Sequence, residues 1–141
     1  MNHTLYVETS ALLRAILEHD RSLEDLLTDP TRTLVTSALT VLEATRTIAR
    51  ARRDGRLTAV GAREASRRLM GFERSVDVRA IDEEVLHHAR QVFPVEPVRT
   101  LDAIHLATLR LFDQEERAVS LITCDDRVGR NALALGFEVL P

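Results

Sequence analysis

Four acidic residues stand where a carboxylate could take part in catalysis, because each follows or lies among apolar residues. They are Glu8 in L-Y-V-E-T-S-A-L-L, Glu43 in S-A-L-T-V-L-E-A-T-R, Asp102 in R-T-L-D-A-I-H-L-A-T and Asp125 in L-I-T-C-D-D-R. A carboxylate is costly to bury alone, so acids in such surroundings need a compensating cation. A cluster of carboxylate oxygens favours a hard ion such as Mg²⁺ or Mn²⁺. Metal-assisted phosphoryl chemistry is therefore the first hypothesis.

A structural explanation competes with this one for three aspartates. Asp102, Asp125 and the neighbouring Asp126 also fit the acids that commonly cap or begin helices. Glu43 fits this explanation less well, because its neighbours Val41, Leu42 and Ala44 predict a partly buried helical turn. The four acids together support a site more strongly than any one of them alone.

The elements that must position these acids alternate along the chain. Strands are expected at residues 4–7, 33–36, 76–81, 118–123 and 137–140, and helices at about 9–27, 37–54, 58–73, 82–93, 100–112 and after 125. Alternating strands and helices predict an α/β fold, with a parallel β-sheet flanked by helices on both faces. The sequence contains no linker or internal repeat, so residues 1–141 are expected to form one domain.

Convergence of the acids follows from this topology. Sites in open parallel sheets collect outside the carboxyl ends of the strands. Glu8 and Asp125 follow predicted strands, whereas Glu43 and Asp102 lie near the starts of helices that return from the same side. Asp102 comes two residues after the expected cap Thr100, where the helix dipole favours negative charge. We therefore expect the four carboxylates to share one edge of the sheet.

Composition limits the classes of function. The net charge of −3 argues against a surface that is basic throughout and binds nucleic acid everywhere, but allows a local basic track. Aromatic residues make up 4% of the chain, too few to favour binding by base stacking. Cys124 is the one cysteine, which excludes an internal disulfide and suits a reducing cytosol. No segment has the pattern of a membrane span or a secretory signal, so a cytoplasmic protein is expected.

The same segments carry a family resemblance. Y-V-E-T-S-A-L-L, V-L-E-A-T-R, R-T-L-D-A-I-H-L-A-T, L-I-T-C-D-D-R and the final A-L-A-L-G-F-E-V-L occur in the order and rough spacing of PIN-domain proteins. The chain most resembles the VapC-type toxins of bacterial toxin–antitoxin pairs, over essentially its whole length.

The resemblance implies a single PIN-like domain with Mg²⁺- or Mn²⁺-dependent endoribonuclease activity. In the family pattern Glu8, Glu43, Asp102 and Asp125 match the first to fourth acids, which serve as catalytic and metal-binding residues. Ser10 matches the small hydroxyl residue often found just after the first acid, and with Arg46 and Arg50 it is predicted to bind substrate. The first acid is usually Asp, and the extra methylene of Glu8 changes the reach of its carboxylate.

Partners follow from the same resemblance: an RNA substrate, a VapB-type antitoxin and a second copy of the chain in a homodimer. Arg46, Arg50 and Arg53 recur on roughly the side of the helix that carries Glu43, and could guide an RNA backbone toward the metal. A solvated or antitoxin-facing surface explains these arginines equally well. An apolar docking face is expected on the helix at 12–27 or on residues 57–72.

Other residues near the acids have simpler explanations. His105, one turn after Asp102, either braces that acid or is a satisfied, partly buried histidine. Cys124 fits a small buried residue better than a reactive thiol.

Two alternatives to the toxin nuclease remain at this point. The first is a catalytically weak PIN-like domain that binds RNA or a protein partner, favoured by Glu8. The second is a DNA-directed nuclease of related fold, which the lack of a broad basic surface disfavours.

Overall fold

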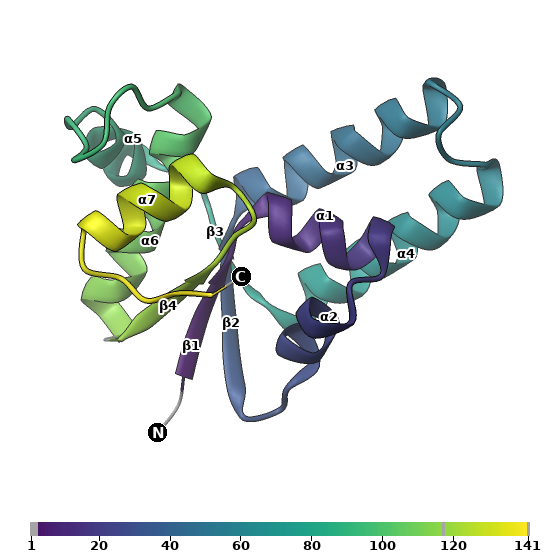
Figure 1. Cartoon of the computed structure of the whole chain (residues 1–141), viewed down its shortest axis with the longest axis horizontal. Coiled ribbons are helices and arrows are strands. Elements are labelled where there is room, and N and C mark those ends of the chain that lie inside the picture. Colours follow the sequence, from purple (N-terminus) through teal and green to yellow (C-terminus); the bar gives the residue numbers. More distant parts are fainter. Residues whose placement is uncertain (1–2, 117, 141) are drawn as a thin grey trace.

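A sheet of parallel strands forms the centre of the computed structural model, which describes residues 3–116 and 118–140 (Figure 1). The strands of this described part are β1 (His3–Val7), β2 (Arg32–Ser37), β3 (Asp77–Arg79), β4 (Val119–Ile122) and β5 (Val139–Leu140). Their order across the sheet is β3-β2-β1-β4-β5, and every neighbouring pair is parallel. The predicted parallel α/β sheet is confirmed.

Helices connect the strands and cover the sheet. They are α1 (Thr9–Glu18), α2 (Arg21–Thr28), α3 (Ala38–Arg53), α4 (Ala59–Ser75), α5 (Glu83–Ala89), α6 (Thr100–Glu116) and α7 (Asp126–Ala134). Helices α3 and α4 pack side by side and extend away from the sheet as a long helical hairpin (Figure 1). Among the residues described, no helix is both long and apolar enough to cross a lipid bilayer.

Alternation along β1 divides the core between the two faces of the sheet. Leu5 and Val7 belong to a cluster with residues of α1, α2, α3 and α4. Tyr6, between them, points to the other face and packs in a cluster with residues of α6 and α7. Successive side chains of a strand point to opposite faces, so helices cover both sides of the sheet, as predicted.

The strand order changes direction between β1 and β4. The chain leaves β1 toward β2 on one side, and β4 pairs with β1 on the other side. This is the arrangement in which open α/β sheets bind ligands outside the strand ends. Val7 pairs with Ile122, and the Glu8 amide donates a hydrogen bond of 3.0 Å to the Ile122 carbonyl. Glu8 and Thr123, the residues that follow these two strands, therefore leave the sheet side by side.

The sequence prediction was wrong about one continuous helix over residues 9–27. His19 adopts a left-handed conformation (φ 53°, ψ 39°) that ends α1, and the Asp20 side chain then caps α2 by accepting from the Leu23 amide. Glycine is the usual residue in a left-handed helix end, and its absence here left no break in the pattern.

Most helix starts were predicted correctly, and several element ends were not. The helices expected to begin at about 37, 82 and after 125 are capped by Ser37, Asp82 and Asp125, and α1 is capped by Glu8. Strands β3 and β5 are shorter than predicted, and α5 ends at Ala89 instead of near Phe93.

The cap of α3 gives a test of how the fold positions Glu43. The buried Ser37 hydroxyl accepts a hydrogen bond of 3.0 Å from the Leu39 amide at the start of α3. We expect Ser37→Ala to lower the free energy of unfolding by about 1 kcal/mol, measured by chemical denaturation. The control Ser66→Ala, on the exposed side of α4, makes the same chemical change without removing a cap. Equal effects of the two substitutions would contradict this role for Ser37.

Candidate active site

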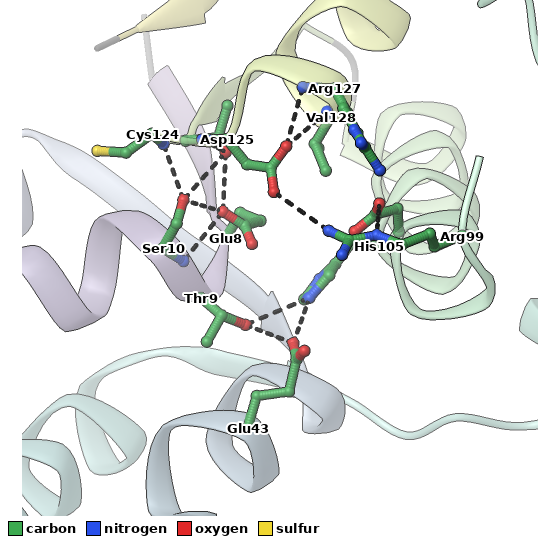
Figure 2. A network of polar contacts seen from close by, with 12 residues as sticks. Glu8, Thr9, Ser10, Glu43, Arg99, His105, Cys124, Asp125, Arg127 and Val128 are labelled. Carbon is green, nitrogen blue, oxygen red and sulfur yellow. Dashed lines mark hydrogen bonds and ion pairs between the residues drawn. The ribbon is translucent and has the colours of Figure 1, made fainter. Parts of the chain in front are cut away.

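The four acids come together from four elements around the carboxyl ends of β1 and β4. Glu8 follows β1, Glu43 lies in the second turn of α3, Asp102 lies in the first turn of α6, and Asp125 caps α7. Figure 2 shows Glu8, Glu43 and Asp125 with their carboxylates turned into one region, beside Arg99 and His105. Glu8 and Asp102 are buried, whereas the side chains of Glu43 and Asp125 are about a quarter exposed (26% and 27%).

Two hydroxyl groups hold the Glu8 carboxylate against the end of β4. Ser10 and Thr123 both donate to Glu8 Oε2, Thr123 at 2.8 Å, and the Ser10 amide donates to the same oxygen at 3.0 Å. Each hydroxyl in turn accepts from a backbone amide of the loop after β4: Ser10 from Cys124 at 2.8 Å, and Thr123 from Asp125 at 3.0 Å. The ends of β1 and β4 are thus joined through the carboxylate and its hydroxyl partners (Figure 2).

Arg99 is the cation that Asp102 and Asp125 share. Its Nε lies 3.3 Å from Asp102 Oδ2, and its Nη2 lies 3.9 Å from Asp125 Oδ2. The other oxygen of Asp125 accepts from the amides of Arg127 and Val128, which begin α7. The Arg99 side chain is 65% exposed, so solvent screens these ion pairs and the arginine can leave at little cost.

Glu43 has a different set of partners. Its Oε1 accepts from Thr9 Oγ1 and from His105 Nε2, both at 2.7 Å. Although burial alone raises the pKa of Glu43, hydrogen bonds from His105 and Thr9 and the positive charge of Arg99 outweigh that effect and lower it. Glu43 is therefore a carboxylate at neutral pH.

Sequence reasoning missed several members of this site. Of the two alternatives for His105, the satisfied, buried histidine agrees with the structure, whereas the brace of Asp102 does not. His105 contacts Glu43, and Asp102 pairs with Arg99. Thr9 directly follows Glu8, and Thr123 precedes Asp125 by two residues. Neither threonine was predicted to belong to the site. Short hydroxyl residues at strand ends resemble helix caps, which is why the pattern alone did not separate the two roles.

The residues proposed to bind substrate occupy two different environments. Ser10 uses its hydroxyl to hold Glu8 and the Cys124 amide. Arg46 and Arg50 are exposed on α3, and Arg53 lies near the end of the same helix with its Nε 3.3 Å from Asp54. Binding of RNA by these residues stays a prediction.

The donor set suits a hard divalent cation. Within residues 3–116 and 118–140, no three Asp, Glu, His or Cys side chains are gathered closely enough to hold a metal ion in these side-chain positions. Each of Glu8, Glu43 and Asp102 nevertheless accepts its hydrogen bonds with one carboxylate oxygen only. These oxygens are Oε2 of Glu8, Oε1 of Glu43 and Oδ2 of Asp102. In the described part of the chain no hydrogen bond reaches their second oxygens, which leaves oxygen ligands of the type that Mg²⁺ and Mn²⁺ prefer.

Comparison with known proteins defines the class. The PIN domain family model matches residues 5–133, and the chain belongs to this family. The chain is 36% identical to Ribonuclease VapC35 of Mycobacterium tuberculosis, covering 96% of this chain and 95% of the relative.

Solved structures share the fold at low sequence identity. A toxin–antitoxin complex from Klebsiella pneumoniae matches with a TM-score of 0.64 and 17% identity, over 97% of this chain and 96% of that chain. Mycobacterium tuberculosis VapC20, described as a Sarcin-Ricin loop cleaving toxin, matches with a TM-score of 0.62 and 17% identity, over 94% and 95% of the two chains.

The lowered pKa of Glu43 generates a prediction about acid stability. A carboxyl group whose pKa falls on folding stabilises the protein above its unfolded pKa, about 4.3 for Glu, and this contribution disappears as the pH falls through the folded value. Glu43→Gln removes the titrating group. Denaturation of both proteins at pH 7 and pH 3 should therefore give a larger difference in unfolding free energy at pH 7. The control Glu73→Gln, on the exposed surface of α4, should give a small difference at both values. A Glu43→Gln difference that does not change with pH would refute the ionised, hydrogen-bonded Glu43.

Proposed function

We propose that this protein is a divalent-metal-dependent endoribonuclease and the toxin of a type II toxin–antitoxin pair. The observation that supports the proposal is the grouping of Glu8, Glu43 and Asp125 beyond the ends of β1 and β4, with Asp102 joined to Asp125 through Arg99, in a PIN-domain chain 36% identical to a VapC ribonuclease. Residues 1–141 act as one catalytic domain in this proposal.

The proposed cofactor is Mg²⁺ or Mn²⁺, held by the second oxygens of Glu8, Glu43 and Asp102 together with Asp125. A bound divalent ion supplies positive charge that acidifies the attacking water and stabilises the charge developing on the phosphodiester. Binding requires the Arg99 guanidinium to leave Asp102 and Asp125, which its exposed position allows.

The protein supplies orientation and phosphate binding. Glu8 is fixed by Ser10 and Thr123, so its free oxygen has a defined position at the strand end. Arg99 lies at the edge of the site. Once released from the acids, its guanidinium group could pair with a phosphate of the RNA. Arg46 and Arg50 extend the basic track along α3 in this proposal.

The proposed protein partner is a VapB-type antitoxin, by analogy with the complexes among the solved relatives. An apolar pocket of about 400 Å³ lies between α1, α2 and α4, with Leu12, Ile16, Leu27 and Phe72 in its lining. The pocket lies between the two segments predicted as docking faces, residues 12–27 and 57–72. We propose that the antitoxin binds there. Homodimer formation would then use other exposed apolar residues, such as Met70 on α4.

A weakly catalytic RNA-binding or partner-binding domain is the second candidate. It is favoured by Glu8, which is longer than the aspartate expected at that position, and by Arg99, which already neutralises two of the acids.

Loss of Asp102 tests the enzymatic proposal. Asp102→Asn removes the negative charge while keeping the size of the side chain. Cleavage of a mixed RNA substrate with Mg²⁺ or Mn²⁺ should fall by about a hundredfold or more, and EDTA should abolish cleavage by the unmodified protein. The control Asp126→Asn changes an exposed neighbour of the site and should cleave normally. Cleavage that persists in EDTA would point to a contaminating nuclease.

Metal binding can be measured without RNA. A ligand that binds only the folded state stabilises it, by about 2.7 kcal/mol at a free concentration of about 100 times its Kd. The thermal unfolding midpoint should therefore rise with Mg²⁺, and the rise should be largely lost in Asp102→Asn. An unchanged midpoint up to several millimolar Mg²⁺ would exclude a functional metal pocket.

Position 8 distinguishes the two candidate functions. Asp is a preferred helix cap, and Glu8→Asp keeps the charge at the cap of α1 while shortening the reach. If residue 8 binds the metal, RNA cleavage by Glu8→Asp should equal or exceed that of the unmodified protein, whereas Glu8→Gln should be inactive. Equal cleavage rates for all three proteins would remove residue 8 from the site.

A further inference from the structure

We propose that His105 is a positioning residue that fixes the Glu43 carboxylate toward the metal site, and that Tyr6 in turn fixes the His105 ring. The inference rests on the proposed function for its catalytic meaning. The hydrogen bonds of His105 join α6 to Tyr6 in the sheet and to Glu43 on α3.

His105 lies in the interior with both ring nitrogens occupied. It is 2% exposed, and its Nε2 lies 2.7 Å from Glu43 Oε1 and 3.2 Å from Thr9 Oγ1. On the opposite side its Nδ1 lies 2.8 Å from the Tyr6 hydroxyl. The Tyr6 and His105 rings meet edge to face, with their planes at 82°. The ring therefore has no freedom to rotate without breaking hydrogen bonds in a buried region.

The hydrogen-bonding chemistry of the partners fixes one of these contacts. A carboxylate oxygen only accepts, so the hydrogen of the 2.7 Å contact lies on His105 Nε2. The Tyr6 hydroxyl, which can donate or accept, holds Nδ1 on the other side of the ring.

The consequence for Glu43 is a defined side-chain position. A glutamate has three rotatable side-chain bonds, and the contacts of Thr9 and His105 with Oε1 restrict all of them. Across the described residues, no hydrogen bond reaches Oε2, which is thereby left available for a cation. Tyr6 belongs to the central strand β1. The Tyr6–His105 and His105–Glu43 hydrogen bonds therefore fix the Glu43 carboxylate of α3 relative to the sheet.

Substitutions at position 105 separate hydrogen bonding from packing. His105→Gln retains an N–H group near the place of Nε2, whereas His105→Leu fills the space without a donor. Isothermal titration with Mg²⁺ should show a loss of affinity of about 10- to 100-fold for His105→Leu, as expected when the partner of a metal ligand is removed. His105→Gln should recover most of that loss. His87→Gln, on the exposed face of α5, is the matched control and should bind like the unmodified protein.

Tyr6→Phe supplies an independent test if His105→Leu does not fold. The substitution removes the hydroxyl that contacts Nδ1 and keeps the aromatic ring, so the same titration should show a loss of Mg²⁺ affinity that is smaller than in His105→Leu. An unchanged Mg²⁺ affinity in Tyr6→Phe, or equal Mg²⁺ affinities for His105→Leu and His105→Gln, overturns the proposal.

The positioning role and the proposed function can fail separately. If the unmodified protein binds no Mg²⁺ and cuts no RNA, the nuclease proposal fails. Crystal structures of the unmodified protein and His105→Leu then decide the positioning role. A Glu43 side chain that moves in His105→Leu supports it, and one that stays in place overturns it.

Discussion

The pairing of β1 with β4 is the constraint on which the rest of the site depends. Because Val7 lies opposite Ile122, the chain leaves both strands at the same level of the sheet. Glu8 and Thr123 are then within hydrogen-bonding distance, although they are 115 residues apart in the sequence. A shift of one residue in this register would turn one of these side chains to the other face of the sheet.

Electrostatic compensation determines how the acids can stay close together. Like charges in a partly buried site repel one another, and some of them would take up protons without partners. Here hydroxyl and amide donors compensate Glu8, a buried imidazole and a hydroxyl compensate Glu43, and a guanidinium compensates Asp102 and Asp125. Hydroxyl, amide and imidazole donors of the protein interior hold Glu8 and Glu43, and an exposed guanidinium holds Asp102 and Asp125. The second pair is therefore the one whose compensation can be exchanged for a different cation.

The fold, and the position of Glu8 and Asp125 after two strands of the sheet, could be predicted because local patterns encode them. Apolar runs indicate the strands, and an acid directly after a strand in a parallel sheet must lie at its carboxyl edge. The contacts of His105 could not be predicted in this way. Its partner Glu43 is 62 residues away, and the contact depends on how α3 and α6 cross the end of the sheet. The break at His19 was missed for a different reason, because a left-handed histidine has no sequence signal comparable to glycine.

The position of Arg99 affects how a polyanion meets this surface. A cluster of uncompensated carboxylates would repel a nucleic acid strand before any contact formed, and the net charge of the chain, −3, would add to that repulsion. With the guanidinium spread over two of the acids, this surface would instead present an exposed positive group to the phosphates of the proposed RNA substrate. In the proposed function, the approach of the RNA strand and the binding of the metal ion would therefore make opposite demands on Arg99. Dissolved salt screens exposed charges and weakens both ion pairs of this arginine.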